Sequence, residues 1–278
     1  ADPSLFVAPI LYHFEWLHTE YDKVGQALLL GHLMECCTQI TGGFYADPGY
    51  KDLEDLHKLG HPIAEIDENG SFFITKLKNT GGAVTIDICK EQLLYEIGNP
   101  SEYVTPDGIA DFSKVVFREK EKNIVEACNA DSRERTNQYK VNVCYDAGFE
   151  GVGEISYGGR TALERARLAA DIIKKRWEII GVQPEESKFD YIGYDSLFGG
   201  VISNKISDAL PYEVRLRISV LTKDERTAKR LLRELQCMYI NGPAGSCGIT
   251  TRIDRLIAIE NILVDRSDVK YSVRIEEI

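Results

Sequence analysis

The sequence has no apolar run long enough to cross a membrane. The longest apolar stretch near its N-terminus, Leu5 to Tyr12, is interrupted by Pro9, whereas a membrane helix needs about 20 consecutive apolar residues. A secretory leader also needs an unbroken apolar segment. We therefore expect no signal peptide and no membrane segment.

Clusters of positive charge are also missing. The chain has 33 lysines and arginines against 44 aspartates and glutamates, which gives a net charge of -11. No group of basic residues is interleaved with aromatic ones, as it would be in a surface that binds phosphates and stacks on bases. Nucleic acid is therefore excluded as an expected partner.

Several motifs of cofactor chemistry are absent as well. The seven cysteines are odd in number and include no CxxC pair, which favours reduced thiols over a disulfide framework. There is no HExxH sequence for zinc, and neither glycine-rich nucleotide motif, GxGxxG or GxxxxGK[ST], occurs. We predict no bound metal and no cofactor, and redox and phosphoryl-transfer functions are disfavoured.

With 278 residues, 44% of them hydrophobic, the chain can bury a large core. Periodicity predicts a mixed α/β (α+β) protein in which residues 1–200 form a core with a mixed sheet and flanking helices, and residues 201–278 form a smaller α+β lobe. The predicted helices are 22–39, 90–97, 161–177 and 224–239. The predicted strands are 63–66, 71–76, 189–194, 212–221, 255–263 and 269–275.

The most informative segment is the predicted helix over 22–39. His32, Glu35, Cys36 and Gln39 lie at i, i+3, i+4 and i+7, so they share one narrow sector of a helix whose flanks are apolar. One interpretation is acid/base chemistry, with a histidine and a carboxylate passing protons. The other is a buried hydrogen-bond network that ties the helix to its neighbours. Likewise, Cys36 is either a nucleophile activated by His32 or an inert thiol.

Two glycine turns share the sequence Thr-Gly-Gly, at 41–43 and 80–82. Glycine lets backbone amides approach a phosphate or carboxylate closely, so both turns are candidates for binding an anionic or carbonyl oxygen. The turn at 41–43 follows the polar helix directly and is the better candidate. For a third glycine-rich segment, 242–248, we favour a simple turn between a helix and a strand.

Taken in order, several blocks of the sequence resemble the acyclic terpene utilisation AtuA family of bacteria and fungi. They are Tyr12-His13-Phe14 with Trp16, Gly31-His32-Leu33-Met34-Glu35-Cys36, Thr41-Gly42-Gly43, Pro62-Ile63-Ala64-Glu65, Thr80-Gly81-Gly82, residues 91–98, Tyr103 with Thr105-Pro106-Asp107, residues 153–157 and Gly242-Pro243-Ala244-Gly245. The resemblance implies a cytoplasmic protein of pathways that degrade citronellol, geraniol and related branched acids as coenzyme A thioesters. Members usually continue upstream, which implies a missing N-terminal portion or a partner subunit.

Residues and resemblance together give a functional hypothesis. We expect an enzyme, assembled as a homo-oligomer, that performs hydratase- or lyase-type acid/base chemistry on a carboxylic acid or an acyl-CoA thioester. The expected catalytic residues are His32, Glu35 and Cys36. The expected substrate-binding residues are His13, Trp16, Gln39, Thr41, Gly42, Gly43, Glu65, Thr80, Gly81 and Gly82. The alternative hypothesis is a non-catalytic subunit or ligand-binding module of a catabolic complex.

Overall fold

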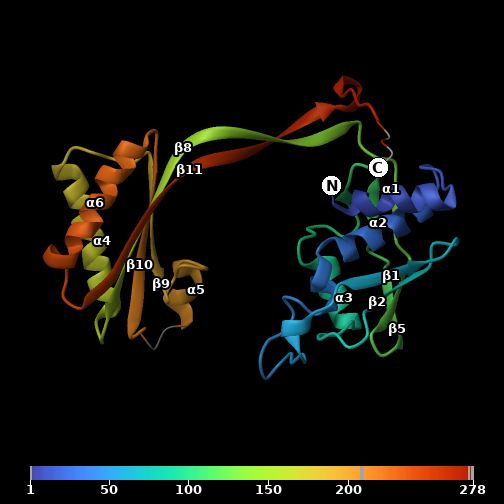
Figure 1. Cartoon of the computed structure of the whole chain (residues 1–278), viewed down its shortest axis with the longest axis horizontal. Coiled ribbons are helices and arrows are strands. Elements are labelled where there is room, and N and C mark those ends of the chain that lie inside the picture. Colours follow the sequence, from blue (N-terminus) through green and yellow to red (C-terminus); the bar gives the residue numbers. More distant parts are fainter. Residues whose placement is uncertain (1, 207–209, 275, 277–278) are drawn as a thin grey trace. The chain divides into compact units, whose positions relative to one another are not determined.

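The computed structural model describes residues 2–206, 210–274 and 276. They fall into two compact units, coloured along the chain in Figure 1: unit 1 comprises Ala1–Lys140 with Leu263–Ile278, and unit 2 comprises Val141–Ile262. The described residues form six α-helices and three antiparallel sheets. The predicted α/β mixture is thus confirmed. The predicted domain boundary at residue 200 stays a prediction. A domain is a part of the chain that folds by itself, whereas these two units are defined by contacts alone.

Unit 1 combines three helices with two small sheets. The sheets have the strand orders β1-β2-β6-β5 and β3-β4-β7. The elements are α1 (Asp2–Phe14), α2 (Tyr21–Glu35), β1 (Pro62–Ile66), β2 (Phe72–Lys76), α3 (Ile86–Leu94), β3 (Tyr103–Val104), β4 (Ile109–Asp111), β5 (Val116–Glu121), β6 (Ile124–Cys128) and β7 (Asp131–Arg133), with 3-10 turns at Cys37–Thr41, Leu56–Lys58 and Arg266–Asp268.

Helix α2 runs through the middle of unit 1 and is buried on nearly all sides from Val24 to Leu33. Two glycines allow this. A Cβ atom at Gly25 would lie 2.4 Å from the backbone of Asp131, and one at Gly31 would lie 2.4 Å from the carbonyl oxygen of Pro3. A helix that is apolar all round is stable only inside a protein, so α2 is the element around which unit 1 is packed.

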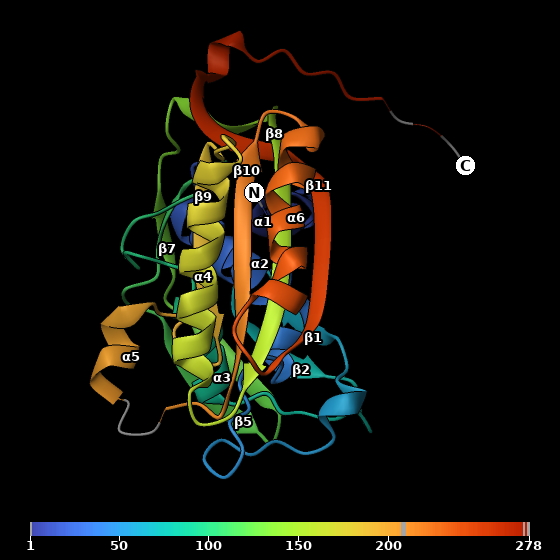
Figure 2. The same cartoon turned by 90° about the vertical axis from the view of Figure 1, so that its left-hand side faces the viewer.

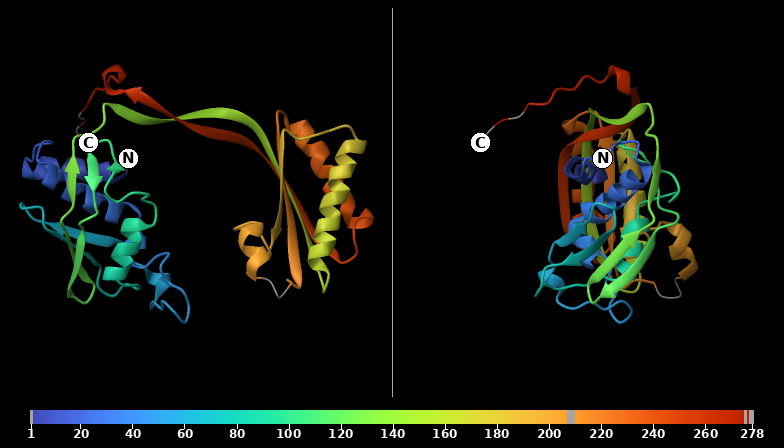
Figure 3. Two further views of the ribbon diagram at one scale, coloured as in Figure 1. Left: turned by 180° about the vertical axis from the view of Figure 1, so that it is seen from behind. Right: turned by 90° about the vertical axis from the view of Figure 1, so that its right-hand side faces the viewer.

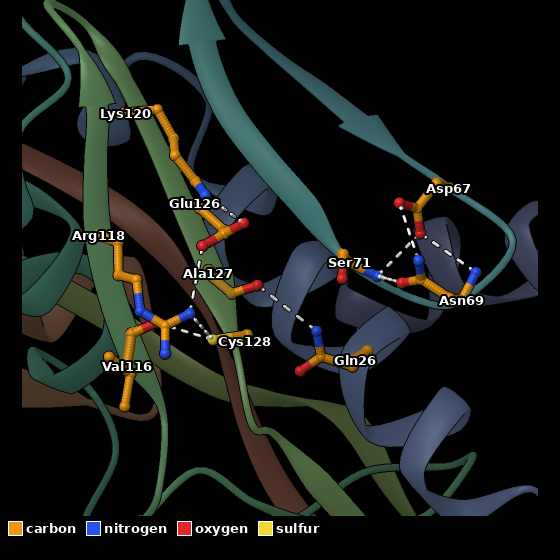
Figure 4. Close-up of polar contacts among 10 residues, drawn as sticks. All are labelled: Gln26, Asp67, Asn69, Ser71, Val116, Arg118, Lys120, Glu126, Ala127 and Cys128. Atoms are coloured by element: carbon orange, nitrogen blue, oxygen red, sulfur yellow. Dashed lines mark hydrogen bonds and ion pairs between the residues drawn. The ribbon is translucent and has the colours of Figure 1, made fainter.

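A buried glutamine links α2 to the larger sheet of unit 1 (Figure 4). The Gln26 side chain donates to the carbonyl oxygen of Gly70 at 2.9 Å and accepts from the amide of Ala130 at 2.8 Å. On the neighbouring strands, the hydrogen bond from Lys120 holds the pKa of Glu126 below its usual range, and Arg118 adds to the effect. The hydrogen bonds of Gln26 therefore fix the position of α2 along the sheet, which apolar contacts alone would hold less specifically.

Unit 2 is built on one four-stranded sheet with the order β11-β8-β10-β9. Its elements are β8 (Gln138–Gly158), α4 (Ala162–Ile179), β9 (Glu186–Ile192), α5 (Gly200–Ile206), β10 (Glu213–Thr222), α6 (Glu225–Asn241) and β11 (Ser246–Asp265). Apart from α5, connections and strand order are those of the β-α-β-β-α-β arrangement called ferredoxin-like. Figures 2 and 3 show α4 and α6 together on one face of this sheet.

The core of unit 2 lies between that face and the two helices. Alternate residues of β10, from Val214 to Thr222, are buried, as expected for a strand covered on one side. Glycine at 151 and 153 of β8 gives α6 room, because a Cβ at Gly153 would meet Leu235 at 2.4 Å. The sequence also predicts Asp224 as the cap of the helix over 224–239. Asp224 accepts from the amide of Thr227 at the start of α6, so this prediction is confirmed.

Three local predictions are wrong. The helix expected over 90–97 is α3, Ile86–Leu94, which starts earlier because the Thr85 hydroxyl accepts from the amide of Ile88 and caps it. Thr19 followed by Asp22 resembles a capping box in the sequence, but α2 begins after Glu20 and has no side-chain cap. Residues 269–274 form no strand, and Ile275 lies outside the described residues. Among the described residues, no helix has both the length and the apolar content to span a bilayer.

Candidate functional site

The candidate site lies where α2 and α3 end. Helix α2 stops at Glu35 because Cys37 takes the left-handed conformation, with φ 51°. The chain then makes the 3-10 turn Cys37–Thr41, which Gly42 closes at φ 109°. The predicted helix to Gln39 is therefore wrong in its last turn, although the left-handed turn expected at Gly42 is confirmed. His32 and Glu35 stay one turn apart on α2, while Gln39 leaves the shared face.

His32 is completely buried, and both nitrogens of its ring have a partner. Its Nδ1 lies 2.8 Å from Oε1 of Glu35, and its Nε2 lies 3.1 Å from the carbonyl oxygen of Leu93. Tyr103 and Phe112 flank the ring, with centroids 5.2 and 5.9 Å away. Because a carbonyl oxygen only accepts, Nε2 carries a proton. The short contact at Nδ1 then holds a second proton, shared between imidazole and carboxyl.

The ends of the two helices cap each other. The last four carbonyls of a helix have no partner within it. Nε2 of His32 donates to the Leu93 carbonyl of α3, and Nε2 of Gln92 donates in return to the His32 carbonyl of α2 at 3.1 Å. Oε1 of Gln92 is buried without a partner among the described residues. His32 therefore has a structural role, whatever its chemistry.

Three further polar groups surround this pair. Cys36 Sγ lies 2.9 Å from the hydroxyl of Tyr95, and Oε1 of Glu96 lies 3.9 Å from Nδ1 of His32. Desolvation, together with hydrogen bonds to Cys36 and Glu96, raises the pKa of the Tyr95 phenol, so the group stays protonated and can donate. Unlike His32, the side chain of Glu96 is 41% exposed. The cluster is thus closed at His32 and open to solvent at Glu96.

Of the described residues, one group of side chains has the geometry of a metal site. His32, Glu35 and Glu96 each offer a ligand atom, and these atoms all lie within 4.8 Å of one another. Imidazole and carboxylate groups bind zinc, and they also bind other divalent transition metals. The sequence predicted no metal, because Glu96 is far from His32 in the chain and no spacing rule connects them.

The two Thr-Gly-Gly turns are joined to each other. The Ala83 amide donates to the Thr41 carbonyl at 3.0 Å, and a Cβ at Gly82 would lie 2.1 Å from the same oxygen. Each of the four glycine amides already donates to a backbone carbonyl. The amides of Gly42, Gly43, Gly81 and Gly82 donate to the carbonyls of Gln39, Thr38, Lys58 and Glu54, respectively. These contacts give the turns a structural role, and binding of substrate by them stays a prediction.

His13 and Trp16 line a cavity of about 690 Å³ beside the C-terminal half of α1. Its apolar lining is Val7, Ala8, Leu11, Tyr12 and Trp16, and its polar lining is His13, Glu15, His18 and Asp107. Oδ2 of Asp107 is buried without a partner among the described residues, and Glu15 has the unusual φ of 57°. Backbone strain of this kind often marks binding sites.

The predicted site residues therefore divide among several places. His32, Glu35 and Cys36 lie together, and Glu65 lies on β1 in a separate surface hollow with Lys120 and Glu126. Residues that sequence reasoning missed are Tyr95, Glu96 and the Leu93 carbonyl. In the sequence, the only sign of these residues was that they belong to the block 91–98, which resembles the AtuA family. In the structure, this block includes the end of α3 and contacts the end of α2.

Comparison with known families places the chain in one of them. The model of the acyclic terpene utilisation family protein AtuA matches residues 1–275. The chain belongs to the AtuA family. No individual curated protein matches it significantly. Membership in the AtuA family implies a role in acyclic terpene utilisation.

The thiols of this AtuA protein are expected to differ sharply in reactivity. All seven cysteines are free; Cys37, Cys144 and Cys247 are exposed, and Cys89 is buried. Burial raises the pKa of the Cys89 thiol to about 12, so at pH 8 only about one molecule in 10⁴ carries the reactive thiolate there. Titration with a chromogenic disulfide at pH 8 should label the exposed thiols first and Cys89 only after unfolding.

A Cys89→Ser variant provides the control for this titration. Its native protein should show the same fast reaction as the parent, and its unfolded chain should contain one reactive thiol fewer. A smaller fast phase in the native variant would contradict the placement of Cys89 in the core of unit 1.

Proposed function

We propose that the chain is an acid/base enzyme of acyclic terpene and branched-acid catabolism. Its substrate is a carboxylic acid or the acyl-CoA thioester of one, and its reaction is of the hydratase or lyase type. The observation that carries the proposal is the 2.8 Å contact between Nδ1 of His32 and Oε1 of Glu35, at a cluster that reaches solvent through Glu96. Additions of water to an activated double bond, and the reverse eliminations, need a group that takes up and returns one proton.

In this proposal Glu35 exchanges the proton and His32 holds it in place. The 7% exposure of the Glu35 side chain puts its carboxyl between the sealed imidazole and the open part of the cluster. The phenol of Tyr95, kept protonated by its raised pKa, can donate to a carbonyl or carboxylate oxygen of the substrate. Cys36 forms a hydrogen bond with that phenol and thereby orients it.

Turnover of terpenoid and short branched acyl-CoAs, with the free acids beside them, tests this proposal. Glu35→Gln keeps the shape of the side chain but cannot carry the shared proton, and we expect it to lower kcat by about 100-fold or more. His57→Ala, at an exposed histidine of the Leu56–Lys58 turn, is the matched control and should leave kcat unchanged. Trp16 fluorescence verifies folding. Full activity of the folded Glu35→Gln protein would refute the proposal.

A second candidate function, a non-catalytic ligand-binding module, is favoured by one specific observation. The 690 Å³ cavity holds His13 and Trp16 but none of the residues of the His32 cluster, and His32 itself is sealed. The apolar lining of this cavity suits a branched hydrocarbon chain. In that case Trp16→Ala should abolish binding of the acids in a thermal-shift screen, and Glu35→Gln should have no effect beyond a change in stability.

A further inference from the structure

The ends of α2 and α3 gather negative charge that no lysine or arginine balances. Glu35 and Glu96 both approach Nδ1 of His32, at 2.8 and 3.9 Å. In the part of the chain that the structure describes, neither carboxylate forms an ion pair with a lysine or an arginine. Both helices also point their C-terminal ends here, and such ends carry partial negative charge. A partly buried site of this kind requires a cation.

The orientation of His32 is that of a metal ligand. Because Nε2 donates to the Leu93 carbonyl at 3.1 Å, the nitrogen that faces the two carboxylates is Nδ1. Histidines that bind metals nearly always donate from the other ring nitrogen to a carbonyl or carboxylate, which fixes the tautomer and the plane of the ring. The aromatic rings of Tyr103 and Phe112 hold this plane from the sides.

An unmet acceptor on Gln92, a residue bonded to the His32 backbone, is consistent with the same conclusion. Gln92 is 1% exposed, and its Nε2 is committed to the His32 carbonyl. Its Oε1 is buried and has no donor in the described part of the chain. Water bound to a metal is a strong donor, and it is the kind of partner that this oxygen lacks.

We propose that His32 Nδ1, Glu35 and Glu96 bind one divalent transition metal, with zinc as the best match to one imidazole and two carboxylates. The three ligand atoms already lie within 4.8 Å of one another, and the exposed Glu96 closes on the ion by a side-chain rotation. Three protein ligands leave a position for water, as in catalytic rather than structural zinc sites. The ion would take the place of the proton between Nδ1 of His32 and Glu35. The inference rests on the proposed function only for its use, because the bound water would then exchange the proton in place of Glu35.

Zinc binding to the whole chain tests the inference without any assay of activity. After treatment with a chelator and its removal, titration calorimetry with Zn²⁺ and elemental analysis should give one ion per chain. Glu96→Gln removes one ligand charge at an exposed position, and it should weaken zinc at least tenfold, since even the loss of an outer-sphere partner costs about 10- to 100-fold. Glu68→Gln, an exposed glutamate of the turn after β1, is the control and should bind zinc like the parent.

The other outcomes are also decisive. Absence of stoichiometric binding, or binding that Glu96→Gln and Glu35→Gln leave unchanged, overturns the inference. Zinc lost instead in His13→Ala or His18→Ala would assign the ion to the cavity beside α1. Specific zinc binding without turnover of any acid or thioester would keep the metal site and refute the proposed function. Turnover that survives the chelator, in a protein that shows no stoichiometric zinc binding, would keep the proposed function and refute the metal site.

Discussion

Replacing Gly81 by alanine is expected to destabilise unit 1 by about 3 kcal/mol or more, at the upper end of what overpacking a core usually costs. The added Cβ would lie 1.8 Å from the carbonyl oxygen of Asp55 and 2.5 Å from its carbonyl carbon. Both are backbone atoms, so no side-chain rotation relieves the contact. Moving them disturbs the bond that the Asp55 carbonyl accepts from the Lys58 amide at 2.8 Å, and moving Gly81 instead disturbs its own bond to the Lys58 carbonyl at 3.0 Å.

The two tryptophans of the chain allow a clean measurement, since Trp16 lies in unit 1 and Trp177 in unit 2. In a Trp177→Phe background, the fluorescence of Trp16 reports urea unfolding of unit 1 alone. Gly98→Ala is the matched control, because a Cβ there meets nothing within 4 Å, and it should leave the midpoint unchanged. A Gly81→Ala protein with the midpoint of the Gly98→Ala protein would contradict the packing described here.

This prediction also explains why the Thr-Gly-Gly pattern was ambiguous in the sequence. Glycine is needed both where a ligand approaches the backbone and where another segment of the chain does. In the sequence the two cases look alike. The structure shows the second case at Gly81 and Gly82, against Asp55 and Thr41.

Elements defined by local signals could be predicted from the sequence. The apolar spacing and the Asp224 cap gave α6, and the turn at Asn69 and Gly70 separated β1 from β2, with Gly70 at φ 88°. The strand predicted over 212–221 is β10, in which alternate residues are buried. In each of these cases the residues that decide the conformation lie within a few positions of one another.

The candidate site could be predicted only in part, because half of it depends on distant contacts. His32 and Glu35 are one helical turn apart, so periodicity places them together. Leu93 is 61 positions from His32, and nothing local indicates that the end of α3 meets the end of α2. The left-handed Cys37 is equally hidden, because this conformation is rare for residues other than glycine and asparagine, and it moved Gln39 off the predicted face.

Shortening Ile173 to alanine is expected to destabilise unit 2 by about 2 to 5 kcal/mol, the range for removing a large aliphatic side chain from a core. Ile173 has no exposed surface, and it belongs to the buried cluster between α4, α6 and the sheet. Trp177, one turn further along α4, is 2% exposed and donates from Nε1 to the Leu231 carbonyl at 3.1 Å. The cavity left by the truncation therefore opens beside the indole that reports it.

The measurement is urea unfolding of unit 2 in a Trp16→Phe background, with Trp177 as the reporter. Leu168→Ala removes a similar volume from the same helix at a position that is 52% exposed. Because little apolar surface returns to water there, the control should shift the free energy of unfolding by less than about 1 kcal/mol. Equal losses in the two variants would mean that α4 does not present Ile173 to the sheet. A large loss confined to Ile173→Ala would confirm that this face of α4 holds unit 2 together.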